Sequence, residues 1–306
     1  MSTPAMTVRP LPVLCLAAAS AFLPRLSGAQ VSTAPELPTS TRMMALGGNA
    51  QALAQSTSGV FSNPAAMSLG RTYHVDSLTL YDPTVGRWMF GGAVADTTRM
   101  VSASFAYNYS LIDGATGVRN HHDVRLGLSV LLTEGIALGL TGRYMNLGGP
   151  LSSNTRLGTD FAGVTFDAGA VVRPVSFLTL AVTGYSLTNP DTAASPLSIG
   201  GGIAITPVEA LSIVGDTVWD LRTYSEPRMR LSGGVEFLLD KVPLRAGYLF
   251  DDTRLGGPVH TVTAGVGYID RLFGAEFSMQ QDVAGAALSQ TTLMLNLRYF
   301  YNPGSS

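Results

Sequence analysis

Thiols, charges and long apolar runs are scarce in this chain of 306 residues. Cys15 is the only cysteine, so the sequence excludes an internal disulfide and a thiolate metal cluster. Charged residues make up 13%, about half of the usual ~25%. Beyond the first 29 residues no uncharged apolar run approaches the ~18 residues of a spanning helix. These features leave two classes, a soluble all-β protein or a membrane β-barrel whose apolar residues alternate with polar ones.

Basic residues and chemical motifs are sparse as well. Lys241 is the only lysine, and 19 Lys and Arg stand against 21 Asp and Glu without a basic tract, so nucleic acid is not an expected partner. His121 and His122 are adjacent and would point to opposite faces of a strand, which argues against a metal site. Gly265-Val266-Gly267 is not followed by a predicted helix, so it is not a nucleotide loop. We therefore predict no enzyme activity, cofactor or metal.

The first 29 residues have the order of a secretory signal peptide. Arg9 precedes the apolar run Leu11–Leu23, and the small residues Ser27-Gly28-Ala29 follow it. This order predicts export and cleavage after Ala29. Cleavage would remove Cys15 and leave a mature chain without cysteine, which suits passage through an oxidising compartment.

From Tyr73 onward the chain alternates between apolar and other residues. Leu231, Val235 and Phe237, for example, would share one face of a strand, opposite Arg230 and Glu236. The runs are longer than the ~5–6 residues of a typical soluble strand and close to the ~9–11 residues of a strand that crosses a bilayer. We count about fourteen, at 73–82, 86–96, 99–110, 121–133, 135–147, 160–173, 176–187, 196–206, 209–220, 227–239, 242–251, 259–269, 271–281 and 290–301.

The connections between these runs alternate in length. Short turns such as 133–135 and 269–271 follow every second strand, and longer loops such as 111–120, 148–159 and 282–289 follow the others. Outer-membrane barrels have this rhythm, whereas Greek-key sandwiches do not. Tyr and Trp near the strand ends fit the aromatic girdles of such barrels: Tyr81, Trp88, Tyr109, Tyr144, Tyr185, Trp219, Tyr248, Tyr268 and Tyr299.

Charged residues within the predicted strands should face the lumen. An Arg at the lipid midplane costs roughly 2–4 kcal/mol. Such charges could form ion pairs that hold a segment inside the barrel, or they could line a solute path. The predicted lumen-facing set is Arg125, Arg143, Asp167, Asp216, Arg230, Glu236, Arg245, Glu276 and Arg298.

The stretch 41–70 differs from the rest because it consists of small residues without period-2 alternation. It contains the pair Gly47-Gly48 and the step Asn63-Pro64-Ala65, in which Pro64 restricts Asn63 to extended or turn geometry. We predict a compact, mostly coiled plug with one short helical turn near Gln51–Gln55. Inward glycines would leave room for it near the wall: Gly139, Gly169, Gly200, Gly202, Gly247, Gly265 and Gly267.

These features divide the chain into four parts. We predict a signal peptide at 1–29, a plug or hatch at 30–72, a transmembrane β-barrel at 73–301 and a short tail at 302–306. The predicted fold class is all-β, an antiparallel barrel of about fourteen strands with the plug in its lumen.

Two motifs in the plug resemble a known family. Ala45-Leu46-Gly47-Gly48 and Phe61-Ser62-Asn63-Pro64-Ala65 are similar to the N-terminal hatch of the FadL-like long-chain fatty-acid transporters and of the related PorV-like barrels. Later segments, such as 166–170 and 244–248, resemble strands of the same superfamily. The resemblance implies a fourteen-stranded barrel in the outer membrane of a Gram-negative bacterium, a hatch, and diffusion of hydrophobic molecules through the wall.

The resemblance supports two functional hypotheses. The first is passive passage of small hydrophobic molecules, fatty-acid-like or otherwise apolar, with outer-membrane lipid and such a ligand as partners. The alternative is a non-transporting barrel that serves as a partner or scaffold of a secretion or surface-attachment system. The longest predicted loop, at about 147–159, is polar and rich in Gly and Pro, unlike the apolar capture groove of the transporters.

Overall fold

A computed structural model describes residues 40–114, 117–147, 161–254, 256–285 and 290–301. The predicted signal peptide at 1–29, the start of the plug at 30–39, nearly all of the loop at 147–159 and the tail at 302–306 lie outside the described residues. The statements about those segments therefore stay predictions.

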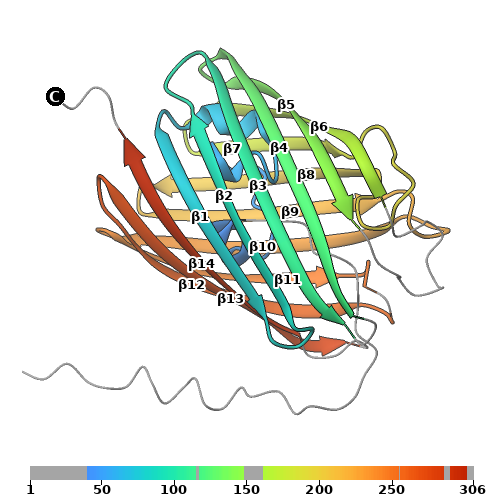
Figure 1. Cartoon of the computed structure of the whole chain (residues 1–306). Helices are drawn as coiled ribbons and strands as arrows, with labels where there is room; N and C mark the ends of the chain where they lie inside the picture. Colours follow the sequence, from blue (N-terminus) through green and yellow to red (C-terminus); the bar gives the residue numbers. More distant parts are fainter. Residues whose placement is uncertain (1–39, 115–116, 148–160, 255, 286–289, 302–306) are drawn as a thin grey trace, which may run out of the picture. The chain divides into compact units, whose positions relative to one another are not determined.

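Fourteen antiparallel strands form a closed barrel, as the sequence predicts (Figure 1). Each strand pairs with its neighbours in the chain, and β1 pairs with β14 to close the sheet. Closure leaves no unpaired strand edge, which is the requirement that hydrocarbon imposes on a sheet. The strands are β1 (Tyr73–Asp82), β2 (Arg87–Asp96), β3 (Val101–Gly114), β4 (Gly117–Thr133), β5 (Ile136–Leu147), β6 (Phe161–Val175), β7 (Leu178–Tyr185), β8 (Ser198–Val208), β9 (Leu211–Asp220), β10 (Arg228–Leu239), β11 (Val242–Asp251), β12 (Val259–Ile269), β13 (Phe273–Gly285) and β14 (Thr291–Tyr301).

Most predicted boundaries agree with the structure to within about two residues, but two predicted loops are wrong. The segment 111–120 is mostly strand, because β3 continues to Gly114 and β4 begins at Gly117 with a regular cross-strand register. Likewise β13 continues to Gly285, and a bulge opposite His260 and Thr261 takes up the extra residue. Polar residues in these stretches suggested loops, yet backbone pairing with the neighbouring strand extends both hairpins.

The connections lie on two rims. The turn rim holds the short connections after β2, β4, β6, β8, β10 and β12, together with the start of β1 and the end of β14. The loop rim holds the connections after the odd-numbered strands, including the loop 186–197. From β4 onward the lengths alternate between turns and loops as the sequence predicts, whereas β1–β2 and β3–β4 are joined by short connections.

The two faces of the barrel wall differ in polarity. Leu231, Val235 and Phe237 are exposed on the outer face, whereas Arg245 and Glu276 are buried inside. Apolar residues exposed on alternate positions occur around the whole wall, as a lipid-facing surface requires. Tyr185 is an exception to the predicted girdle, because it ends β7 with its side chain buried on the inner face.

Three short helices precede the barrel: α1 (Thr41–Ala45), η2 (Ser56–Ser58) and η3 (Pro64–Leu69). Among the described residues, no helix has the length and apolar character to cross a membrane. The predicted helical turn at Gln51–Gln55 is wrong. Ser40 caps α1 by accepting a hydrogen bond from Met43 N at 3.3 Å, which places the helix ten residues earlier, while residues 51–53 form a turn.

Candidate functional site

Residues 40–70, called the lumen segment from here on, cross the interior of the barrel. Helix α1 contacts β11, β12, β13 and β14, whereas η3 contacts β3, β4, β5 and β6, on the other side of the closed sheet. Nearly all of the segment is buried, with Leu46, Asn63 and Met67 fully covered. In Figure 1 its short helices appear in blue among the strands.

Glycines of the wall mark the places where the lumen segment touches it. A Cβ on Gly234 would lie 2.8 Å from Leu46 Cα, and one on Gly200 would lie 2.8 Å from the Gln51 amide. On Gly139 a Cβ would overlap the backbone of Pro64. At Gly234 and Gly139 the backbone of the segment therefore approaches the sheet more closely than a wall side chain would allow. A Cβ on Gly247 would likewise meet the backbone at Gly47. On Gly169, Gly202 and Gly265 it would meet side-chain atoms of Asn63, Gln51 and Ala45, whereas Gly267 lies against Glu276 of the neighbouring strand.

Asn63-Pro64-Ala65 forms the entry to η3. Asn63 caps the helix, with its Oδ1 accepting from Ala65 N at 3.0 Å, and Pro64 occupies the first helical turn, where its missing N–H costs nothing. The wall holds this turn in place, because Ser129 donates to Ala65 O at 3.1 Å and Asn63 Nδ2 donates to Ala170 O at 3.4 Å.

Gly47-Gly48 forms the exit from α1. Gly47 has φ +94° and Gly48 has φ +112°, a region that L side chains rarely adopt. Gly48 N donates to Met43 O at 2.8 Å, which closes the end of the helix. A Cβ on Gly47 would also lie 2.7 Å from Tyr248 O, so this position requires glycine for both its backbone conformation and its space.

One network of ion pairs joins α1 to the wall. Arg42 donates to both carboxylate oxygens of Glu236, at 2.6 and 2.9 Å. Arg245 then bridges Glu236 and Glu276, at 2.5 Å to each. Arg298 lies 3.4 Å from Glu276 and donates to Asp76 at 2.7 Å. Acidic and basic groups alternate along this chain of contacts, which runs over β10, β11, β13, β14 and β1.

A second network lies on β4, β5 and β6. Asp123 accepts from Arg125 at 2.6 Å and from Arg143 at 3.0 Å, and Arg143 lies 3.6 Å from Asp167. Arg125 also donates to the carbonyl oxygens of Val60 and Phe61, each at 3.3 Å. Here all the charges belong to the wall, and the lumen segment supplies only backbone acceptors.

The remaining two predicted lumen charges behave differently from each other. Asp216 is buried on β9 and accepts from Gln51 N at 2.7 Å, so it holds the middle of the lumen segment. Arg230 is half-buried and forms no ion pair with any described residue. Among the described residues, Arg230 therefore has no ion pair with which to hold the segment.

Two contacts that hold the lumen segment were not predicted from the sequence. Arg42 is the only charged residue between Thr41 and Gly70, and that isolation in a stretch of small residues was a usable signal. The second is a hydrogen-bonded group in which Thr57 meets His74 Nε2 at 2.6 Å and donates to Asp76. No local pattern links Thr57 to β1, because the contact arises only when the segment folds back into the barrel.

A cavity of about 130 Å³ lies between the lumen segment and the loop rim. Met43 and Phe61 of the segment form its floor, and Tyr185, Val218 and Leu249 contribute apolar wall. Polar groups also line it, including Ser186, Ser198, Arg230, Asp251, Arg254 and Gln280. The cavity is thus lined by both apolar and polar side chains.

Comparison with known proteins shows the fold. No family model matches the sequence, and no curated protein matches it. The structure is similar to that of the toluene transporter TbuX of Ralstonia pickettii, with a TM-score of 0.60 and 12% identity over 87% of this chain and 99% of that one. The monoaromatic hydrocarbon channel CymD gives a TM-score of 0.59 and 10% identity over 81% and 93%.

A FadL homologue of Pseudomonas aeruginosa gives a TM-score of 0.55 and 14% identity over 90% of this chain and 99% of that one. The chain therefore has the FadL-like barrel fold that its hatch motifs predicted. At these identities the likeness shows the fold alone.

Proposed function

We propose that this protein is an outer-membrane channel for the passive passage of small hydrophobic molecules. The observation that carries the proposal is the cavity against the lumen segment, lined by Met43, Phe61, Tyr185, Val218 and Leu249. Its volume of about 130 Å³ is close to that of the ~150 Å³ apolar protein cavity that binds benzene. A molecule of monoaromatic size fits this space, whereas a long acyl chain could occupy it only in part.

The outer face of the barrel supports a membrane location. Exposed Leu, Val, Ile, Phe, Tyr and Trp side chains cover the wall, and the charges within the strands, such as Arg125, Arg245 and Glu276, are buried on its inner side, whereas Asp96 lies at the turn-rim end of β2. Burying such a surface in lipid is favourable, whereas exposing it to water as one contiguous patch would promote association. The aromatic residues near both rims are typical of the girdles at the two membrane interfaces.

The proposal gives the lumen segment the role of a plug. It crosses the interior, and ion pairs, hydrogen bonds and close backbone contacts hold it to opposite walls. A barrel of this size without filling would leave an aqueous hole. The segment would keep ions out while a hydrophobic molecule passes beside it.

The shared fold adds support for the substrate class. TbuX and CymD are described as a toluene transporter and a monoaromatic hydrocarbon channel. Toluene is therefore a suitable first probe, because it is similar in size to the cavity and has no group that requires a polar partner.

The test fills the cavity without touching the lipid face. Val218→Phe adds a ring at a buried inner position of β9 that lines the cavity. Ile213→Phe adds the same phenyl ring at an outward position of the same strand, where 43% of the side chain is exposed. We expect Val218→Phe to reduce toluene entry into cells severalfold and Ile213→Phe to leave it unchanged.

Both variants must first be shown to reach the outer membrane in heat-modifiable, folded form. Equal toluene entry for wild type, both variants and cells lacking the protein would overturn the transport proposal. A loss of surface-protein display in Val218→Phe with unchanged toluene entry would point instead to the scaffold role considered from the sequence.

A further inference from the structure

Two clusters on the outer face of the barrel repeat one pattern. On β3 and β4, Tyr109 lies directly across from His122, and Tyr107 lies two residues before Tyr109. On β11 and β12, Phe250 lies directly across from His260, and Tyr248 lies two residues before Phe250. The two strand pairs are separated in sequence by more than a hundred residues, so the repeated pattern does not reflect a local motif.

The contacts within the clusters also correspond. Tyr107 Oη lies 2.9 Å from His122 Nδ1, and Tyr248 Oη makes the same hydrogen bond to His260 Nδ1. The second aromatic ring packs beside the imidazole in each case, with centroids 5.0 Å apart for Tyr109 and 5.3 Å apart for Phe250. The tyrosine hydroxyl occupies Nδ1 with a hydrogen bond, and the neighbouring ring restricts the orientation of the imidazole plane.

This arrangement leaves each Nε2 as a hydrogen-bond donor. The phenol is the more acidic partner and the imidazole lone pair the better acceptor, so the phenol donates to Nδ1 and the neutral imidazole carries its hydrogen on Nε2. A protonated imidazole would also carry a hydrogen on Nε2. Among the described residues, nothing hydrogen-bonds to Nε2 of His122 or His260.

The clusters lie at one height on the barrel. Tyr109 and Phe250 are each eight residues from the first residue of their strand at the turn rim. Eight residues span about 26 Å along a strand and, at the ~40° tilt of such barrels, roughly 20 Å along the membrane normal. The apolar band of outer-membrane barrels is about 25 Å tall, so the clusters lie at its edge on the loop-rim side.

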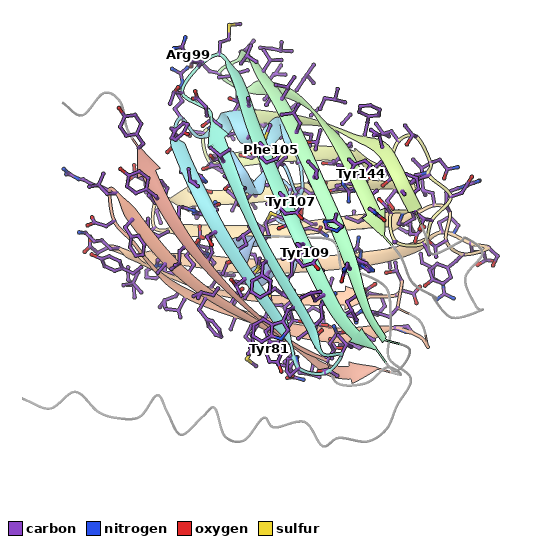
Figure 2. The ribbon with its side chains drawn as sticks, viewed as in Figure 1. Tyr81, Arg99, Phe105, Tyr107, Tyr109 and Tyr144 are labelled. Atoms are coloured by element: carbon purple, nitrogen blue, oxygen red, sulfur yellow. The ribbon has the colours of Figure 1, made fainter. Side chains whose placement is uncertain are left out.

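Other outward aromatic residues occupy the same level. Tyr81, Tyr144 and Trp219 are likewise eight residues from the first residue of β1, β5 and β9. Figure 2 shows Tyr81, Tyr109 and Tyr144 in one row across the front strands. The row is an interfacial girdle, and His122 and His260 are the two imidazoles placed beside it.

The depth of these donors identifies what they meet. Toward the turn rim lies hydrocarbon, which offers no hydrogen-bond acceptor. An aromatic girdle needs only amphipathic rings, so it does not account for a fixed imidazole N–H. A fixed N–H at this level faces the headgroups of the outer leaflet, whose strongest acceptors are phosphate oxygens. Beside His122 there is also an open hollow of about 660 Å³, with Phe90, Tyr107, Tyr109 and Asn120 among its lining residues, which is suited to the start of an acyl chain.

We propose that each cluster binds the phosphate group of an outer-leaflet glycolipid through the histidine Nε2–H. The adjacent aromatic rings contact the sugar and the upper acyl chain. The inference rests on the outer-membrane location within the proposed function, and it does not depend on transport.

The test measures lipid bound to the full protein purified from membranes. The protein would be exchanged into phosphatidylcholine nanodiscs that contain either lipid A or dephosphorylated lipid A. Native mass spectrometry would then measure how much of each lipid the protein retains. The variant pair His122→Phe plus His260→Phe keeps the rings and removes both donors, and Tyr81→Phe is the girdle control. We expect the pair to weaken lipid A binding about tenfold, as for the loss of a hydrogen bond to a charged group, and the control to leave it unchanged.

Tyr107→Phe plus Tyr248→Phe provides a second, milder variant that frees Nδ1 and keeps both rings, and we expect an intermediate loss. Equal retention of phosphorylated and dephosphorylated lipid A, or no change in either histidine or tyrosine pair, would overturn the proposal. Displacement of lipid A by inorganic phosphate at similar concentration would also overturn it, since the site would then bind free phosphate. Failure of the wild type to insert into nanodiscs would contradict the membrane location itself, a result distinct from insertion without lipid selectivity.

Discussion

The two ends of the lumen segment meet the barrel wall by different chemistry. At the η3 end, on β3 to β6, the segment contributes Ala65, Ala66 and Met67, all fully buried, and its backbone fits over wall glycines. The α1 end also packs buried apolar residues such as Leu46 over wall glycines. It adds a charge, Arg42, whose side chain is 20% exposed and pairs with Glu236 at 13% exposure. Apolar contact is indifferent to ionic strength, whereas a partly exposed ion pair is weakened by salt.

This difference implies that the ends are not equally easy to release. Moving η3 away would open a cavity against Gly139 and expose apolar surface, and both effects cost free energy. Moving α1 away would also expose buried Met43, Met44 and Leu46, but there a partly exposed ion pair would be exchanged for hydration as well. The α1 end is therefore the end whose attachment to the wall should weaken with salt.

The largest effect should follow from removing both ends at once. Deletion of Thr41–Leu69 leaves every strand pair intact, so the barrel should still fold, while its lumen loses its filling. We expect conductance in planar bilayers to rise from near closure to that of an open barrel of this size. A folded deletion variant with unchanged conductance would mean that the segment does not close the lumen.

The η3 end can be broken alone by one added side chain. Gly139→Val would drive a branched side chain into the Pro64–Ala65 backbone, and overpacking of this kind costs typically 1–3 kcal/mol. Gly142→Val on the same strand is the matched control, since its Cβ points outward with 3.7 Å to the nearest atom, in Phe166. We expect a leak for Gly139→Val that does not depend on salt, measured as single-channel current, and no leak for the control.

The α1 end can be broken by removing its charge. Arg42→Ala leaves Glu236 with Arg245 alone, and we expect a loss of roughly 1 kcal/mol, as for a partly exposed ion pair. The variant should open more often at low salt, and raising the salt should bring the wild type toward it. Arg230→Ala on β10 is the control without an ion partner among the described residues. Identical salt responses in Arg42→Ala and wild type would remove the proposed difference between the ends.

The smallest effect should come from the cap of η3. Asn63→Ala removes the hydrogen bond to Ala65 N, a loss of about 1 kcal/mol for a helix cap. The close packing of the Pro64–Ala65 backbone over Gly139 remains, so we expect only brief openings. Asn189→Ala, in the loop after β7, is an amide control away from the segment. A leak as large as that of Gly139→Val would show that the cap, and not the packing, positions η3.

The barrel could be predicted from the sequence because its determinants are local and repeated. Alternation of apolar and other residues fixes which face of each strand meets lipid, and every strand carries that information independently. The outward Leu231 and the inward Arg245 follow from parity alone. The hatch motif was likewise readable, since Pro64 and Asn63 restrict their own backbone wherever they occur.

The tertiary structure alone decided which groups meet across the lumen. The pairing of Arg42 with Glu236 joins residues 194 positions apart. Arg230 looks equivalent in the strand pattern, yet among the described residues it has no such partner. The repeated Tyr–His clusters on β3–β4 and β11–β12 also depend on register between strands. Parity along a strand gives the face of a residue, but its height and its neighbours are set only when the sheet closes, because closure fixes the stagger of every strand against the next.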